Sequence, residues 1–157
     1  MNMKKSKIKA YIFFILVTVL GGLLTGYITS RGVYNYELSV ITPAITPPSE
    51  VFPVVWTVLY TLMGISAAMI WNATENGDDL FIYWMQLLVN YFWSFLFFGF
   101  KMYLIAFVWL LMLLVLIISM IVSFYSKRKL AAYLQIPYAL WVAFAGYLNF
   151  SIWMINR

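Results

Sequence analysis

The chain has 157 residues, of which 65% are hydrophobic and only 10% are charged, and its formal net charge is +5. Soluble domains are about 45–50% apolar, and a chain of this length cannot hide so large an excess inside one core. The composition excludes an ordinary soluble domain and indicates one domain, residues 1–157, whose outer surface faces lipid.

The positive charge does not indicate a protein that binds nucleic acid. Seven of the ten basic residues lie in two short clusters that flank apolar runs, at Lys4, Lys5, Lys7 and Lys9 and at Lys127, Arg128 and Lys129. Clusters in such positions set the topology of membrane proteins. The chain also has no cysteine and no histidine. It therefore lacks thiolate and imidazole nucleophiles, bases and metal ligands, and we expect no metal site.

Five apolar stretches follow one another along the chain, at residues 8–29, 51–71, 80–99, 102–125 and 130–155. Each is close to the ~20 residues that a membrane-crossing helix needs. Residues 80–125 carry a single charge, at Lys101. One helix of that length would extend about 69 Å, against a hydrocarbon core of about 30 Å. We therefore expect a break near Gly99–Lys101.

These stretches predict an all-α membrane protein, a bundle of five transmembrane helices. Backbone groups in lipid must pair within a helix or a closed barrel, and barrel strands alternate over only about 10 residues. The expected location is an integral, multi-pass position, in the cell membrane if the source is bacterial. Seven basic residues fall on the side of the N-terminus and three on the other side, which predicts that the N-terminus lies inside.

The one long expected connection is residues 30–50. It contains Pro43, Pro47 and Pro48, which forbid a continuous helix and bias the preceding residues to extended shapes. A long apolar and aromatic loop among short ones is a candidate lid, and a simple surface connector is the alternative.

The acidic residues all fall outside the expected spans, at Glu37, Glu50, Glu75, Asp78 and Asp79. Proton-coupled pumps and transporters usually hold ionisable groups at mid-membrane. The sequence therefore disfavours a proton relay built on carboxylates, and equally a hydrolase built on paired carboxylates.

Aromatic and neutral polar residues recur at helical spacing on one face of three spans. These faces hold Pro53, Trp56, Tyr60, Met63 and Ala67; Gln86, Asn90, Trp93 and Phe97; and Tyr138, Trp141, Ala145, Leu148 and Asn149, with Trp109 and Leu114 approaching from the fourth span. Rings that converge inside a bundle would form a flat apolar slot for a large planar ligand. Plain aromatic packing and hydrogen bonds between helices are the alternatives.

Two further features concern the helices themselves. Pro137 lies inside the fifth span, where we expect it to kink the helix. Gly64 and Ala68, like Gly22 and Gly26, are spaced to let helix backbones approach closely, either within the chain or at a dimer seam.

Three motifs carry a resemblance to a known family. They are TPAITPPSEVFPVVWTVLYTLMGIS (residues 42–66), NYFWSFLFF (residues 90–98) and PYALWVAFAGYLN (residues 137–149). Together they resemble the signature of the TspO/MBR family, the tryptophan-rich sensory or translocator proteins that include the peripheral-type benzodiazepine receptor. The chain departs from the family at Ile45, where a tryptophan is frequent, and at Tyr36-Glu37, where Trp-Tyr is frequent.

The resemblance implies a five-helix membrane bundle, commonly a homodimer, that binds tetrapyrroles such as protoporphyrin IX and haem as ligands rather than as a required cofactor. Light-dependent breakdown of protoporphyrin is attributed to bacterial members. Matched residue by residue, the pocket tryptophans would be Trp56 and Trp141, which would also serve any photo-oxidation. The resemblance further assigns to the pocket Asn90, Trp93 and Ala145, with Phe52 and Leu114 as additions.

The expected functions belong to different classes. The first is a binding and sensory protein for tetrapyrroles, with the propionates near Arg31 or the loop backbone. Without histidine or cysteine, haem would gain only tyrosine or methionine as an axial ligand, so the metal-free porphyrin is the more natural guest. The others are photo-oxidation of bound protoporphyrin, transport of porphyrins or similar amphiphiles, and a purely structural membrane module.

Overall fold

The computed structural model describes residues 2–157, with side-chain surroundings from Lys7 onward. Its elements are α1 (Asn2–Ser39), α2 (Val51–Thr74), the short helix η1 (Gly77–Leu80), α3 (Phe81–Ser94), the π-helix η2 (Phe95–Gly99), α4 (Tyr103–Lys127), α5 (Lys129–Tyr133) and α6 (Ile136–Ile155). No strand occurs in this part of the chain. Five helical segments are long and apolar enough to cross a membrane, at residues 7–39, 51–74, 77–99, 103–127 and 129–155. The predicted fold class is confirmed.

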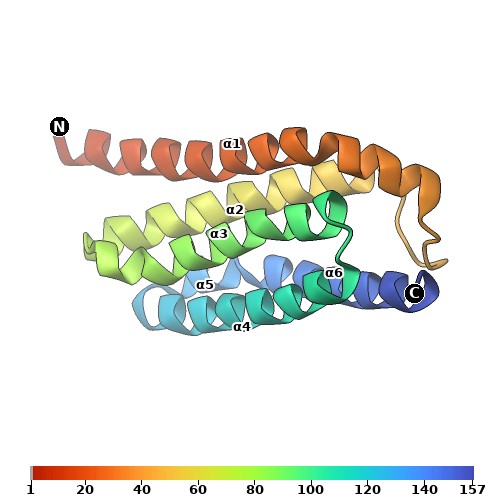
Figure 1. Ribbon diagram of the computed structural model, residues 1–157. Coiled ribbons are helices and arrows are strands. Elements are labelled where there is room, and N and C mark those ends of the chain that lie inside the picture. The colour runs from red at the N-terminus through yellow and green to blue at the C-terminus, as the bar shows by residue number, and fades with distance from the viewer. Residues whose placement is uncertain (1) are drawn as a thin grey trace.

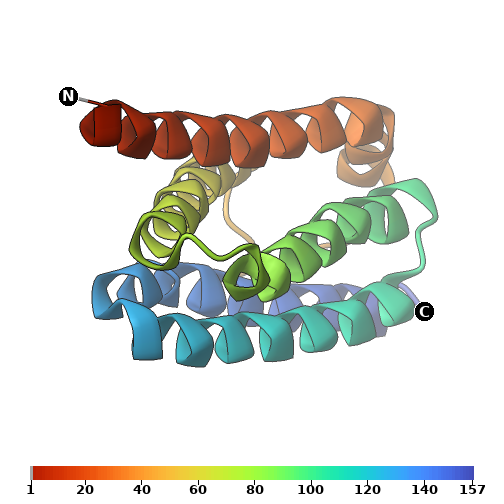
Figure 2. The same cartoon turned by 90° about the vertical axis from the view of Figure 1, so that its left-hand side faces the viewer.

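The helices run along one axis in three layers. Figures 1 and 2 show α1 on one side, α2 with α3 in the middle, and α4 with α5 and α6 on the other side. The largest contacts join α1 to α2 and α4 to α6, and α3 packs on α4. Large apolar side chains are exposed around the outside, especially on α1 and α4, as the lipid-facing surface of a transmembrane bundle requires.

The first helix is longer than the sequence indicated. Residues 30–39, which we placed in the long loop, continue α1 as far as Ser39, so the connection to α2 is only residues 40–50. The prolines that stop a helix begin at Pro43. Gly32, which looks like a breaker, lies against the backbone of Phe98, where an added Cβ would be 2.4 Å from the carbonyl oxygen. Tertiary packing therefore favours helix at a position that intrinsic propensity disfavours.

The fifth span also differs from expectation at Pro137, which does not kink a helix. The span divides into α5 and α6 at a turn, and Pro137 lies in the first turn of α6. A backbone N–H at that position would have no partner within the helix, so proline costs nothing there. The expected break between the third and fourth spans is present at residues 100–102, where Lys101 takes a left-handed conformation with φ 55°.

Close contact between α1 and α2 depends on Gly64. A Cβ at this glycine would lie 2.6 Å from the Cα of Ile15. Ala68 beside it is fully buried. Within the chain, this pair thus serves the packing of α1 on α2.

The two ends of the bundle differ in charge. The start of α1 and the link between α4 and α5, with Lys127, Arg128 and Lys129, lie at one end, and Lys127 forms an ion pair with Asp79 there. The loop of residues 40–50 and the C-terminus lie at the other end (Figure 1). The basic clusters therefore gather at the end opposite the loop.

Candidate functional site

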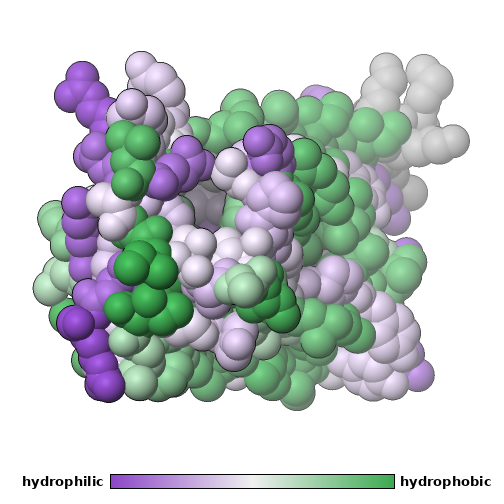
Figure 3. Space-filling view, turned by 90° about the vertical axis from the view of Figure 1, so that its right-hand side faces the viewer, coloured by the Kyte–Doolittle hydropathy of each residue, from purple (hydrophilic) through white to green (hydrophobic). Residues whose placement is uncertain are grey.

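A cavity of about 870 Å³ lies between α1, α2, α3 and α6 and is bordered by the loop of residues 40–50. Figure 3 looks at this end of the bundle and shows a hollow between the helices. The described lining is mostly apolar, with aromatic rings Tyr27, Tyr36, Phe52, Trp56, Tyr60, Trp93, Phe97 and Phe98 and polar side chains that include Thr25, Thr29, Glu37, Thr42, Thr46, Ser49, Asn90, Ser94 and Asn149. Ligand pockets in proteins measure about 300–1,000 Å³ and have this mixture of groups.

One wall of the cavity is built by the end of α3 and the π-helix η2. A π turn contains one residue more than an α turn and is frequent at functional sites. The extra residue brings Phe98 onto the same wall as Trp93 and Phe97. Trp93 stacks on Phe97 with 5.2 Å between ring centroids and 28° between planes. The indole N–H of Trp93 donates to Asn149 Oδ1 at 3.2 Å, which fixes the ring.

A second stacked aromatic pair comes from α2. Trp56 stacks on Tyr60 with 5.4 Å between centroids and 28° between planes. The first turn of α2 is unstrained because Pro53 needs no hydrogen-bond partner there. Trp56 and Tyr60 lie one turn apart on the same helix face, so both reach the cavity.

Beneath these rings, a chain of hydrogen bonds joins three helices. The Tyr60 hydroxyl donates to Asn90 Oδ1 at 2.7 Å, Asn90 Nδ2 donates to the Tyr138 hydroxyl at 2.9 Å, and Tyr138 donates to Gln86 Oε1 at 2.8 Å. Tyr138 and Gln86 are fully buried. Polar groups in an apolar interior are costly unless paired, and this pairing fixes Tyr60 and Asn90, the two members of the chain that line the cavity.

The α1 wall contains a stripe of mostly small and polar residues. Thr25, Gly26, Thr29 and Val33 recur at three- and four-residue spacing and line the cavity. Nothing lies within 4 Å of a Cβ added at Gly26, whereas one at Gly22 would be 2.2 Å from the ring of Tyr60. Gly22 therefore makes room for the Tyr60 ring, and Gly26 leaves open space above it.

The structure brings together five of the seven site residues assigned by the resemblance. Phe52, Trp56, Asn90, Trp93 and Ala145 all line the cavity.

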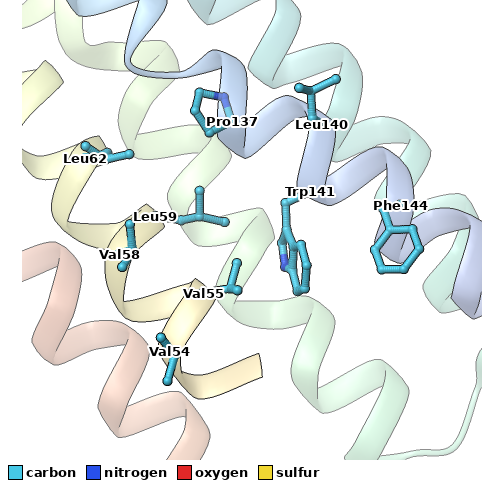
Figure 4. Close-up of a pocket in the computed structure, with 9 residues that line it drawn as sticks. All are labelled: Val54, Val55, Val58, Leu59, Leu62, Pro137, Leu140, Trp141 and Phe144. Atoms are coloured by element: carbon cyan, nitrogen blue, oxygen red, sulfur yellow. The ribbon is translucent and has the colours of Figure 1, made fainter. Parts of the chain in front are cut away.

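The remaining two residues, Trp141 and Leu114, are not among the residues that line the cavity. Trp141 lines a separate, wholly apolar groove of about 490 Å³ between α2 and α6, and Figure 4 shows its indole pointing from α6 toward Val55. Leu114, on α4, packs against the hydrophobic core.

Sequence reasoning missed the contribution of α1. The stripe of Gly22, Gly26, Thr29 and Val33 has helical spacing and could have indicated an interior face, but small residues there indicate packing as readily as a cavity. Tyr36 was missed because it was placed in a loop, and its ring lies 5.4 Å from that of Phe97.

The chemistry available to the lining is limited. In the described part of the chain, no group of three histidine, cysteine, aspartate or glutamate residues could hold a metal ion. A haem iron in the cavity would find oxygen ligands only, such as the hydroxyls of Tyr27, Tyr36 and Tyr60. Arg31, which we expected beside the propionates, is not among the lining residues. The stacked rings suit stacking and shape recognition.

Comparison with known proteins agrees with these features. Residues 14–154 match the TspO/MBR family. The "Tryptophan-rich protein TspO" of Chlorobaculum tepidum is 34% identical over 125 residues, 77% of this chain and 79% of that protein. The "Protein CrtK" of Rhodobacter capsulatus is 34% identical over 149 residues, 92% of this chain and 91% of that protein. The "Translocator protein" of Bos taurus is 32% identical over 149 residues, 92% of this chain and 88% of that protein.

Proposed function

The chain belongs to the TspO/MBR family of membrane proteins, and from this premise we propose that it binds a planar tetrapyrrole, such as protoporphyrin IX or haem, in the cavity beside the loop. The observation that carries the proposal is the pair of stacked aromatic walls. Trp56 with Tyr60 and Trp93 with Phe97 come from the second and third spans and line one cavity of about 870 Å³. A macrocycle offers each wall a flat, polarisable face.

The metal-free porphyrin fits this lining better than haem. The tyrosine hydroxyls are weak axial ligands, and that of Tyr60 already donates to Asn90. Propionate groups would reach the side of the cavity bordered by the loop, where the exposed Thr42 and Ser49 offer hydroxyls. Iron therefore adds little to binding here, and the ring system supplies most of the contact area.

A second candidate, photo-oxidation of bound protoporphyrin, is favoured by the position of Trp56. The excited macrocycle and dioxygen supply the chemistry, and the protein positions an electron-rich indole against the ring. Trp56 lines the cavity, whereas Trp141 lines the separate apolar groove between α2 and α6.

The test is a protoporphyrin titration of the purified protein in detergent, followed by porphyrin absorbance. Trp56→Ala and Trp93→Leu should each weaken binding, while Trp153→Phe should not, because Trp153 lies at the end of α6 outside the lining. Unchanged affinity in both cavity variants would remove the proposal. Illumination under air and under nitrogen tests the second candidate, and breakdown no faster than in empty detergent would remove it.

A further inference from the structure

At the end bordered by the loop of residues 40–50, which we call its mouth, the cavity is lined by one negatively charged side chain. Among the described lining residues, Glu37 is the only carboxylate, and no lysine or arginine lines the cavity with it. Glu37 is exposed near the end of α1 and lines the cavity. A ligand whose polar end lies at the mouth therefore meets a carboxylate that no basic residue of the described lining neutralises.

The other charges at this end of the bundle do not neutralise Glu37 within the cavity. Arg31 lies six residues earlier on α1, about 9 Å along the helix and on a different face. Arg157 is held over the ring of Trp153, 5.5 Å from its centroid. Lys101 belongs to the link before α4. The described residues contain one ion pair, between Lys127 and Asp79, and it lies at the opposite end of the bundle.

Four aromatic rings lie against one another beside this carboxylate. Tyr36, directly before Glu37, is 5.4 Å from both Phe97 and Phe98, and Trp93 is 5.2 Å from Phe97 and 5.9 Å from Phe98. All four rings line the cavity. Aromatic faces attract cations within about 6 Å, and such clusters are used to recognise ammonium groups.

From the carboxylate of Glu37 and the four rings, we propose that the cavity binds a second class of ligand, planar amphiphiles that carry a protonated amine. The ring system of such a ligand lies between the aromatic walls, and its ammonium group rests at the rim against Glu37 and Tyr36. This inference concerns a ligand class beyond tetrapyrroles, whose propionates carry the opposite charge, so it stands independently of the proposed function.

The experiment uses three tricyclic probes of one shape. At neutral pH, 9-aminoacridine is cationic, acridine is neutral and acridine-9-carboxylate is anionic. Each is titrated into the full-length protein in neutral detergent, with protein-free micelles as the blank. We expect affinity to fall from the cation to the neutral ring to the anion. Glu37→Gln should weaken the binding of 9-aminoacridine about three- to fivefold, the range of an exposed ion pair, and leave the binding of acridine unchanged.

Matched variants separate charge from folding. Glu50→Gln is the control, because Glu50 is exposed at the same end of the bundle, makes no side-chain capping bond and does not line the cavity. It should leave all three affinities unchanged. Glu37→Lys should reverse the order of the cation and the anion. Tyr36→Leu should weaken the binding of the cation. Tyr36→Phe keeps the face of the aromatic ring and should not weaken it.

Two results would overturn the inference. One is equal affinity of the wild-type protein for the cation and the neutral ring. The other is a preference for the cation that survives Glu37→Gln. A protoporphyrin titration in parallel keeps the two proposals apart. Protoporphyrin binding with no cation preference removes only this inference, and a Glu37-dependent cation preference without protoporphyrin binding removes only the tetrapyrrole proposal.

Discussion

The ring of Phe52 meets that of Trp141 edge to face, with 5.7 Å between centroids and 64° between planes. Phe52 lines the large cavity, and Trp141 lines the separate apolar groove between α2 and α6. The two tryptophans that the sequence motifs place together are thus not equivalent. Trp56 reaches the cavity itself, whereas Trp141 contacts the ring of Phe52, a residue of the cavity lining.

This arrangement predicts unequal effects of the two tryptophans on ligand affinity. Trp56→Ala should weaken protoporphyrin binding about tenfold, because an aromatic contact contributes about 0.5–1.5 kcal/mol beyond the apolar area it covers. Trp141→Ala should weaken it by no more than about threefold, through loosened packing of Phe52. Absorbance titrations of both variants, with Trp153→Phe as the control, check the prediction. An effect of Trp141→Ala as large as that of Trp56→Ala would contradict it.

The sequence predicted the features that can be recognised without knowing which distant residues are in contact. Apolar length located the five spans, and the motifs located Trp56, Asn90 and Trp93, because indoles and amides stand out among aliphatic residues. The position of Trp141 could not be predicted in this way. Both sides of α6 are apolar, and periodicity does not distinguish a face toward lipid from a face toward the interior.

The continuation of α1 was hidden for a different reason. Gly32 lowers helix propensity, and only the neighbouring backbone of Phe98 shows why glycine is needed there. The sequence shows the glycine, but the contact of Gly32 with Phe98 is visible only in the folded structure. The rim of the cavity, with Tyr36 and Glu37, was therefore assigned to a loop.

Gly32→Ala should destabilise the protein and distort the cavity wall. The added Cβ would lie 2.4 Å from the carbonyl oxygen of Phe98, so α1 and η2 must separate. We expect a loss of about 1–3 kcal/mol, the range of overpacking in a tight contact, seen as a lower midpoint of thermal unfolding in detergent. Gly26→Ala on the same helix is the control, because no atom lies within 4 Å of its added Cβ. Equal stability of the two variants would show that the close approach is absent.

Tyr138→Phe should destabilise the bundle by removing the centre of the hydrogen-bond chain. Asn90 Nδ2 and Gln86 Oε1 would lose the partner that now joins them. A buried polar group left unpaired costs about 1–3 kcal/mol, which thermal unfolding in detergent would detect. Tyr147→Phe is the matched control, because Tyr147 is exposed on the same helix. A neutral effect of Tyr138→Phe would mean that water replaces the hydroxyl.

The distribution of charge predicts the direction in which the cavity opens. Lys127, Arg128 and Lys129 lie at the end of the bundle opposite the loop. Basic residues that flank spans are retained on the cytoplasmic side. The loop, and with it the mouth of the cavity, should therefore face the outside when the protein is placed in a bacterial cell membrane.

Single cysteines can test this orientation directly, since the chain has no cysteine of its own. Ala44→Cys places a thiol on the loop, and Ser126→Cys places one near the end of α4, both at exposed positions. A maleimide that cannot cross membranes should label Ala44→Cys in intact cells and Ser126→Cys only after the membrane is opened. The reverse pattern would put the mouth inside, and a ligand would then have to enter from the cytoplasm. Labelling of both thiols in intact cells would indicate a mixed topology, in which the seven basic residues at one end do not outweigh the three at the other.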